Sequence, residues 1–370
     1  MPEKTIVITG AGGFIGRNLR AALERDKAVE IVCIGSGDGP GKLEDALGRA
    51  DVVFHLAGVN RPKDIHEFAT GNASSTQALV DILEKLGRAP RVVLSSSTQA
   101  VLDNPYGQSK KAAEDILFDF GRRTGAMIHV FRLTNVFGKW SRPNYNSVVS
   151  TFCHNISHGL PITISNPANV VELVYVDDVV KAFLEVMDGG VPSGFVEAGP
   201  SHSLTLGELA DTIYALHGIR KSLVIPDLSD DFTRKLHATY LSYLDPDDFA
   251  YDLDMKTDNR GALAELIKSP NFGQMFVSRT HGGITRGNHY HDSKIEKFCV
   301  LQGEAVIRFR HIFSDDVIEY RVSGEKWQVV DIPPGYTHHI ENMTDQEMIV
   351  LFWANEMFDP ARPDTYFVEV

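Results

Sequence analysis

Roughly the first 240 residues alternate short apolar, β-rich runs with longer helix-like stretches, and this alternation constrains the fold more than any other feature. The runs KTIVITG, VEIVCIG, DVVFHLAG, RVVLSSS and MIHVFRL are separated by helical segments such as STQALVDILEKLG. Apolar runs of about five residues, each followed by a helix, are typical of a mostly parallel sheet with helices on both faces. The sequence therefore predicts a doubly wound α/β domain over residues 1–243.

Three glycines follow the first predicted strand in the segment ITGAGGFIGRNL, where a helix is expected to begin. Such glycines provide a tight turn, a close approach of the backbone to a pyrophosphate, and a helix N-terminus directed at the phosphates. A plain strand-to-helix turn is the alternative, but the position at the start of an alternating domain favours a dinucleotide site. The expected cofactor-binding residues are Gly10, Gly13, Phe14, Ile15, Gly16 and Arg17.

The end of the second predicted strand bears on the choice of cofactor. An NAD enzyme usually presents an acid there to the ribose hydroxyls, whereas this chain has IVCIGSGDG, in which Asp38 comes late. The missing acid leaves room for a 2′-phosphate, which Arg17 could meet. The sequence therefore favours NADPH over NADH.

The segment NPYGQSKKAAE places Tyr106 and Lys110 four residues apart, and so on one face of the helix that begins there. A phenol with a pKa near ~10 transfers protons poorly at neutral pH unless a neighbouring cation lowers that pKa. Lys110 could do this and could also hold the nicotinamide ribose. Ser97, at the end of the strand VVLSSS, could steady the oxygen that receives the proton. We therefore predict Tyr106, Lys110 and Ser97 as catalytic residues, against the alternative of an ordinary solvated helix start.

The pattern changes around Leu244, after which short alternating strands are separated by turn residues and helical periodicity is almost lost. This pattern predicts an all-β sandwich or barrel over residues 244–370. In GNHYHDSKIEKF, His289 and His291 alternate, so on a strand both would face the same side. His339 adjoins His338 in a later run, THHIEN, and is expected to face away from it in a structural role.

Charge and composition exclude several kinds of function. The net charge of −13 argues against a nucleic-acid surface, because phosphate backbones require clustered Lys and Arg. The three cysteines, Cys33, Cys153 and Cys299, form no metal or disulfide motif and suit a reducing compartment. Neither a signal peptide nor a membrane-spanning run is evident, so we expect a cytoplasmic protein that does not insert into membranes.

The N-terminal motifs resemble those of the extended short-chain dehydrogenase/reductase family, which acts on nucleotide sugars. The likeness covers about the first 240 residues and includes VVFHLAGVN, FRLTNVFG and LVYVDDVVKAF. It implies a Rossmann-type fold, with Ala57, Gly58 and Lys110 at the cofactor and with Asn135 and Arg142 at the substrate. Asp177 and Asp178 are expected to cap a helix rather than to act in catalysis.

The C-terminal segments GITRGNHYHDSKIEKFCVLQG and DIPPGYTHHIEN resemble the two motifs of the cupin family, a small β-barrel. The resemblance implies a divalent metal held by His289, His291, Glu296 and His338. One glycine of the second motif is replaced by Trp327, which leaves the ligands intact. Three imidazoles and a carboxylate suit zinc, iron or manganese, and zinc is our first expectation.

Along its full length the chain resembles bifunctional nucleotide-sugar enzymes of bacterial capsule biosynthesis, through segments such as DNPYGQSK, FGKWSRPNYNSVVSTFC and VVDIPPGYTHHIEN. The resemblance implies a homodimer that converts a UDP-linked 4-keto-6-deoxy amino sugar in two steps. The cupin domain would epimerise C3, and the reductase domain would then reduce the C4 ketone with NADPH. The product would be UDP-2-acetamido-2,6-dideoxy-L-talose, a precursor of UDP-N-acetyl-L-fucosamine for capsule or O-antigen.

The sequence leaves an alternative function and the identity of the epimerisation base open. The alternative function is a single activity, that of an NAD-dependent nucleotide-sugar 4-epimerase or dehydratase with a sugar-binding cupin. A dehydratase needs acids directly after the serine, where this chain has Thr98 and Gln99. For the epimerisation base, Tyr290, Tyr336 and His339 are candidates.

Overall fold

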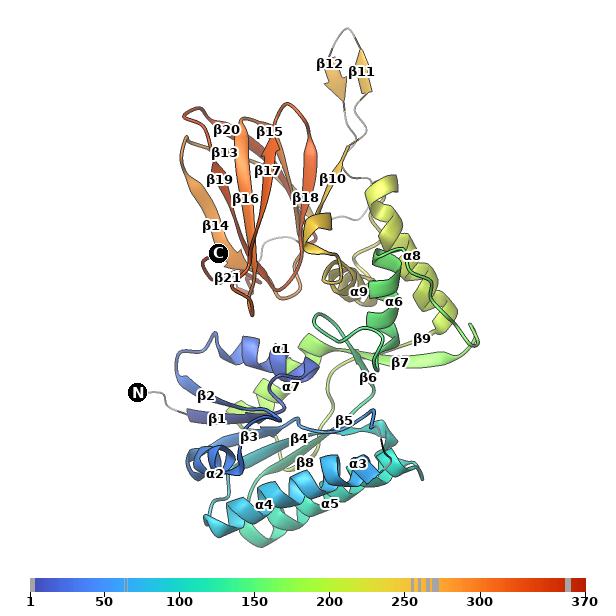
Figure 1. The fold of residues 1–370 in the computed structure, drawn as a ribbon, viewed down its shortest axis with the longest axis vertical. Coiled ribbons are helices and arrows are strands. Elements are labelled where there is room, and N and C mark those ends of the chain that lie inside the picture. Colours follow the sequence, from blue (N-terminus) through green and yellow to red (C-terminus); the bar gives the residue numbers. More distant parts are fainter. Residues whose placement is uncertain are drawn as a thin grey trace. The chain divides into compact units, whose positions relative to one another are not determined.

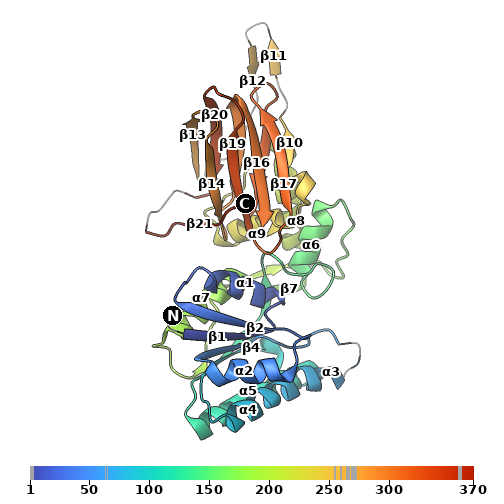
Figure 2. The same cartoon turned by 60° about the vertical axis from the view of Figure 1, so that its left-hand side comes forward.

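The structure is a computed structural model that describes residues 4–62, 64, 66–253, 256–258, 261–263, 267, 273–356 and 361–370. The chain forms two compact units (Figures 1 and 2). The first unit comprises Met1–Val148 and Val170–Leu204, and the second comprises Val149–Asn169 and Thr205–Val370. In the described part of the chain, no helix combines the length and apolar character needed to cross a membrane.

A six-stranded sheet forms the centre of the first unit, in the order β2-β1-β3-β4-β5-β8, and all of its neighbouring strands are parallel. The chain runs outward from β1 to one edge through β2 and then returns to build the other side from β3, so the strand order reverses beside β1. In such sheets, ligands bind at the carboxyl ends of the strands next to this reversal. The strands are β1 (Lys4–Thr9), β2 (Val29–Ile34), β3 (Val52–His55), β4 (Arg91–Ser97), β5 (Ile128–Leu133) and β8 (Gly194–Phe195).

Helices cover both faces of this sheet, so the predicted doubly wound α/β fold is confirmed (Figure 1). One core cluster joins the sheet to α1 (Phe14–Leu23) and α7 (Val176–Asp188). The other joins it to α2 (Pro40–Arg49), α4 (Ser75–Lys85) and α5 (Pro105–Thr124). The remaining elements are α3 (His66–Phe68), a π-helical turn (Ala69–Ser74), a 3-10 turn (Thr98–Val101), and a small sheet of β6 (Asn135–Phe137), β7 (Val170–Tyr175) and β9 (Ser201–Thr205).

The second unit contains two five-stranded sheets in which neighbouring strands are antiparallel, as predicted for the all-β region (Figure 2). Alternate residues of both sheets, such as Phe298, Ile307 and Ile340, form one buried core between them. The first sheet contains β10 (Ala250–Asp252), β18 (Gln328–Ile332), β15 (Glu296–Gln302), β20 (Met348–Ala354) and β13 (Gln274–Thr280). The second contains β17 (Val317–Ser323), β16 (Glu304–His311), β19 (Tyr336–Asn342), β14 (Thr285–Tyr290) and β21 (Tyr366–Phe367). A separate hairpin consists of β11 (Lys256–Asp258) and β12 (Gly261–Leu263).

Three helices share this unit with the β-sheets, namely α6 (Val148–Ser157), α8 (Leu206–Ser222) and α9 (Asp231–Leu241). Helix α8 begins with a capping box, in which Thr205 accepts from the Glu208 amide and Glu208 accepts from the Thr205 amide. The sequence-based boundary at 243/244 falls inside this unit, after α9. A separate domain over residues 244–370 therefore stays a prediction.

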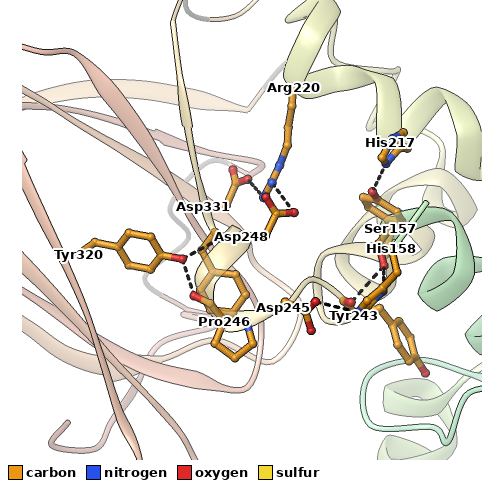
Figure 3. A network of polar contacts seen from close by, with 12 residues as sticks. Ser157, His158, His217, Arg220, Tyr243, Asp245, Pro246, Asp248, Tyr320 and Asp331 are labelled. Atoms are coloured by element: carbon orange, nitrogen blue, oxygen red, sulfur yellow. Dashed lines mark hydrogen bonds and ion pairs between the residues drawn. The ribbon is translucent and has the colours of Figure 1, made fainter. Parts of the chain in front are cut away.

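Polar contacts connect α8 to the β-sheet that contains β18 (Figure 3). Arg220 of α8 binds the carboxylates of Asp331 at 2.9 Å and Asp248 at 3.0 Å. Asp331 is fully buried on β18 and also pairs with Lys297 of β15. Breaking one partner of a buried ion pair typically costs about 3–5 kcal/mol, because it leaves a charge uncompensated. The Asp331 ion pairs therefore fix α8 against the outer face of the sheet that contains β15.

Candidate functional site

The turn after β1 brings the backbone of β3 close to the glycine-rich segment. Gly10 has φ +72°, and a Cβ atom there would lie 2.7 Å from the Ala57 nitrogen. A Cβ atom on Gly16 would lie 2.3 Å from the Gly10 carbonyl oxygen. Both positions therefore require glycine, one for its conformation and both for space. The predicted cofactor residues Gly10, Gly16 and Ala57 meet at the carboxyl end of β1.

Helix α1 presents an uncapped N-terminus beside this turn. Gly13 is the N-cap and has no side chain to bond to the first amides, which belong to the turn containing Phe14 and Ile15. Free amides at a helix N-terminus bind anions, because the helix dipole adds partial positive charge. Arg17 follows on the exposed side of α1. This arrangement suits the pyrophosphate of a dinucleotide.

Asp38, which follows the end of β2, is held in local contacts. Its carboxylate accepts a hydrogen bond from the Gly35 amide at 2.8 Å and pairs with Lys42 at 3.0 Å. The hydrogen bond from Gly35 is the main cause that lowers the pKa of Asp38. Asp38 therefore belongs to its own turn, where Lys42 is its cationic partner.

Helix α5 begins so that Tyr106 lies in its first turn and Lys110 in its second. Asn104 caps it by accepting from the Gly107 amide at 2.8 Å, and Pro105 occupies the first turn. Burial raises the pKa of Tyr106, while a hydrogen bond with Ser97 lowers it. The structure therefore brings the predicted triad together, with Ser97 at the end of β4 next to the phenol.

The expected lowering of the Tyr106 pKa by Lys110 stays a prediction. The Lys110 ammonium lies 6.0 Å from the centre of the Tyr106 ring and donates to the Ser95 carbonyl at 3.0 Å. Burial is the larger influence on Lys110 itself and lowers its pKa to about 8, while Glu114 raises it. Lys110 is thus a buried cation whose charge changes within one pH unit of neutrality.

Two residues that sequence reasoning missed support this site. Asn72 donates to Ser109 Oγ at 2.9 Å and to the Val59 carbonyl at 3.0 Å. A Cβ atom on Gly58 would lie 2.7 Å from Asn72 Oδ1 and 3.2 Å from Lys110 Nζ, so glycine leaves room for both. The buried His55 bridges hydroxyls of neighbouring elements, and burial lowers its pKa to about 4. No local motif points to these roles, because they depend on contacts between elements.

The two predicted substrate residues make contacts of their own. Asn135 begins β6 and donates to the Glu172 carbonyl at 3.1 Å. The guanidinium of Arg142 lies 5.2 Å from the centre of the Tyr145 ring, and that of Arg61 lies 6.0 Å from the same centre. Two cations beside one aromatic ring provide a positive surface in an otherwise acidic chain. Asp177 and Asp178 lie in the first turn of α7 after the N-cap Tyr175, and Asp177 pairs with the buried Lys139 at 2.7 Å.

The second unit brings the four predicted metal ligands together. Each of His289, His291, Glu296 and His338 offers one ligand atom, and these atoms all lie within 4.8 Å of one another. Glu296 Oε2 lies 3.4 Å from His291 Nε2 and 3.7 Å from His338 Nε2. These separations are too long for good hydrogen bonds.

The same separations fit a shared metal ion. Two ligand atoms that each lie about 2.1 Å from a tetrahedral ion are about 3.4 Å apart. The Nε2 atoms of His291 and His338 are buried, and neither has a hydrogen-bond partner in the described structure. Burial lowers the pKa of His289 to about 4, and contacts with the imidazoles outweigh burial to hold the pKa of Glu296 well below its usual value. Neutral imidazoles and an ionised carboxylate are the forms that bind metals.

A segment near the C-terminus fixes the orientation of His291, and no sequence motif pointed to this role. His291 Nδ1 contacts the Asp364 carbonyl oxygen. The Asp364 carboxylate accepts from the amides of Asp292 at 2.8 Å and Lys294 at 2.6 Å. Strand β21 pairs with β14 directly beside His289. Residues 361–370 therefore close over the ligand loop and direct Nε2 of His291 toward the other ligands.

A pocket of about 220 Å³ opens onto this cluster. Typical small-molecule sites measure ~300–1,000 Å³, so only part of a nucleotide sugar would enter. None of the three candidate bases, Tyr290, Tyr336 and His339, lines it, and His339 instead contacts Asn288 and Arg308. Its lining consists of Phe276, His289, Lys294, Glu296, Ala354, Glu356, Arg362, Pro363, Asp364 and Thr365.

Two family models match the chain in the order of its two sites. Residues 6–199 match the NAD dependent epimerase/dehydratase family. Residues 256–366 match the polysaccharide biosynthesis C-terminal domain. The first match contains the glycine turn and Tyr106, and the second contains all four clustered metal-ligand candidates.

Similar proteins extend the likeness over the whole chain. A UDP-2-acetamido-2,6-beta-L-arabino-hexul-4-ose reductase of Pseudomonas aeruginosa is 44% identical and covers 99% of this chain and 98% of its own. The crystal structure of the capsular polysaccharide assembling protein CapF from Staphylococcus aureus is 44% identical, covers 99% of this chain and 100% of its own, and superposes with a TM-score of 0.68. The chain therefore belongs to the NAD dependent epimerase/dehydratase family and, along its full length, to the group that includes this reductase and CapF.

Proposed function

We propose that this protein converts a UDP-linked 4-keto-6-deoxy-N-acetylhexosamine by C3 epimerisation at the cupin site and NADPH-dependent reduction of C4 at the Tyr106 site. The main support for the proposal is that one chain contains two separate groups of reactive side chains. Tyr106, Ser97 and Lys110 form a proton-donating set beside a dinucleotide turn. Three imidazoles and a carboxylate form the other set, beside a pocket.

The first set suits reduction of a ketone. NADPH, when bound, supplies the hydride. Tyr106 donates its proton to the C4 oxygen, and Ser97 holds that oxygen by a hydrogen bond. Burial keeps the phenol protonated at neutral pH, so the donor is in the correct form. The Lys110 ammonium supplies positive charge beside the phenolate that forms when Tyr106 loses its proton.

Two features support NADPH as the form of the nicotinamide cofactor. Asp38 is occupied by Gly35 and Lys42, so it is not placed to bind a ribose hydroxyl. Lys42, which pairs with Asp38 after β2, and Arg17, on the exposed side of α1, offer positive charge that a 2′-phosphate would neutralise. The proposed cofactor is therefore NADPH, held by the glycine turn and by these two cations.

The second set suits a divalent metal, for which we propose zinc. His289, His291, Glu296 and His338 would hold it, and the ion would supply Lewis-acid stabilisation to an oxyanion. The surrounding residues orient the ligands and limit access to the pocket. The C4 ketone acidifies the proton on C3 and is also the group that a hydride reduces. Reduction removes the ketone, so it ends the epimerisation and gives UDP-2-acetamido-2,6-dideoxy-L-talose.

The test uses the purified protein with a UDP-4-keto-6-deoxy-N-acetylhexosamine in heavy water. Without NADPH we expect deuterium at C3, seen by NMR and mass spectrometry. With NADPH we expect cofactor oxidation, measured at 340 nm, and a reduced product with the inverted C3 configuration. Absence of both reactions would contradict the proposal, whereas 4-epimerisation without net NADPH oxidation would favour a single-activity enzyme.

The proposal also includes a homodimer, which the resemblance to capsule enzymes implies. Sedimentation equilibrium over a range of protein concentrations measures the mass directly. A mass near twice the 40.9 kDa of the chain is expected, and a concentration-independent monomer would remove this part of the proposal.

A further inference from the structure

The pocket beside the metal-ligand cluster contains one carboxyl group that has no partner. Glu356 lines the pocket together with His289 and Glu296, and its side chain is half-buried. In the described part of the chain, no hydrogen bond or ion pair reaches its carboxylate. An unpaired carboxyl group in a cleft is a candidate for chemistry, because nothing structural depends on its charge.

The other two carboxylates of the pocket, Asp364 and Glu296, already make structural contacts. The Asp364 carboxylate accepts hydrogen bonds from the amides of Asp292, Ser293 and Lys294. Glu296 directs Oε2 toward the buried imidazoles. Proton transfer by either group would disturb the cluster or the ligand loop, whereas Glu356 is free to change its charge.

The surroundings of Glu356 favour a carboxyl group that binds protons more tightly than an exposed one. Burial raises its pKa above the usual value, and the nearby Asp364 raises it further. Three positive or titratable groups act in the opposite direction, namely Lys294, Arg234 and His291. A carboxylate with a raised pKa is a stronger base than an exposed one.

A hydrogen-bond donor lies in the same pocket. Lys294 Nζ lies 3.0 Å from Thr365 Oγ1 and 3.7 Å from Glu296 Oε1, and all three residues line the pocket. An ammonium held between two oxygens has a fixed direction, and it can donate to a further oxygen that enters the pocket. The pocket therefore contains a base and, separately, a positive group for an oxyanion.

We propose that Glu356 is the residue that removes the proton from C3 of the 4-keto sugar, and that Lys294 donates a hydrogen bond to the C4 oxygen. This inference rests on the proposed function of the cupin site. The C3–H bond breaks, its proton moves to the Glu356 carboxylate, and its electron pair forms the C3–C4 double bond as the C4 oxygen becomes negative. Glu356 then passes its proton to water. A solvent proton adds to C3 from the opposite face, and the C4 carbonyl forms again.

The decisive variant is Glu356→Gln, which keeps the size of the side chain and removes the base. We expect deuterium incorporation at C3 to fall by at least ~100-fold, in the range typical of a lost general base. Metal content and melting temperature should stay at wild-type values, which separates loss of the base from loss of the cluster. Glu325→Gln, an exposed carboxyl of the same β region, is the matched control and should exchange at the wild-type rate.

A second variant keeps the test informative if Glu356→Gln does not fold. Glu356→Asp keeps a carboxylate on a shorter side chain, so it should exchange slowly and with a changed pH profile. In the wild type, exchange should increase as pH rises through the raised pKa of Glu356, because the base must be ionised. Exchange by Glu356→Gln within threefold of the wild type would overturn this inference alone. Absence of exchange in the wild type would overturn it together with the epimerase function.

Discussion

The two candidate sites differ in how their polar groups are satisfied. Around Tyr106, Lys110 donates to Ser95 and His55 bridges two hydroxyls, so this site holds its shape through protein contacts. In the second unit, the buried Nε2 atoms of His291 and His338 have no hydrogen-bond partner in the described structure. An unsatisfied buried polar group costs about 1–3 kcal/mol, which the proposed metal ion would offset.

This difference predicts that the two sites respond separately to mutation, pH and chelators. The reductase site should depend on proton donors that are in place already. The cupin site should depend on a metal that satisfies the imidazoles. Variants that change one reaction and not the other would support separate sites. Variants that reduce both reactions equally would contradict them.

The largest expected effect belongs to Tyr106→Phe, which removes the hydroxyl and keeps the ring. NADPH oxidation should fall by about 10²–10⁴-fold, as expected for loss of a general acid. Deuterium exchange at C3, followed by NMR, should stay at the wild-type rate. Tyr214→Phe on α8, where the side chain is exposed, is the control for loss of a tyrosine hydroxyl. An equal loss of both reactions in Tyr106→Phe would mean that the sites are not separate.

His291→Ala should affect the other site. Loss of a residue that hydrogen-bonds to a metal ligand typically lowers metal affinity about 10–100-fold. Loss of the ligand itself should lower it further. The metal-to-protein ratio, measured by mass spectrometry after dialysis, should decrease, and so should the melting temperature. At a metal concentration of 100 times Kd, binding contributes about 2.7 kcal/mol of stability, which the variant would lose. His281→Ala, an exposed histidine of the same region, should retain both properties. Unchanged metal content in His291→Ala would exclude this histidine as a ligand.

The smallest expected effect is a change of pH profile. The pKa of Lys110 is lowered to about 8, so its ammonium is present below that pH and is lost above it. Burial raises the pKa of Tyr106, so the phenol remains a donor over the same range. The kcat/KM for reduction should therefore fall as pH rises through about 8. In Lys110→Arg, which stays charged, this decline should disappear even if the rate is lower, whereas C3 exchange should show no decline attributable to Lys110. A decline that persists in Lys110→Arg would assign it to another group.

The sequence predicted those parts of each site that lie close together along the chain. Ser97, Tyr106 and Lys110 fall within one strand end and one helix start, so helical spacing placed two of them on one face. His289 and His291 alternate on one strand, and this pattern was sufficient to expect a shared side. The resemblance to known motifs added Glu296 and His338, which lie on other strands. Local geometry is the basis of these predictions, because helices and strands have fixed periods.

Contacts between distant segments could not be predicted from the sequence. Spacing placed Lys110 near Tyr106, but only the structure showed that its ammonium faces the Ser95 carbonyl and that burial dominates both pKa values. The orientation of His291 depends on Asp364, which lies 73 residues later in the chain. Arg220 of α8 binds Asp331 of β18 across 111 residues.

The sequence by itself determined the alternating sheet, the glycine turn, the all-β region and the types of residue available for chemistry. The tertiary structure decided which of these groups are buried, which are satisfied and which one, Glu356, has no hydrogen-bond or ion-pair partner among the described residues. The physical reason is that periodicity is a property of neighbouring residues, whereas desolvation and hydrogen bonding depend on everything that packs around a group.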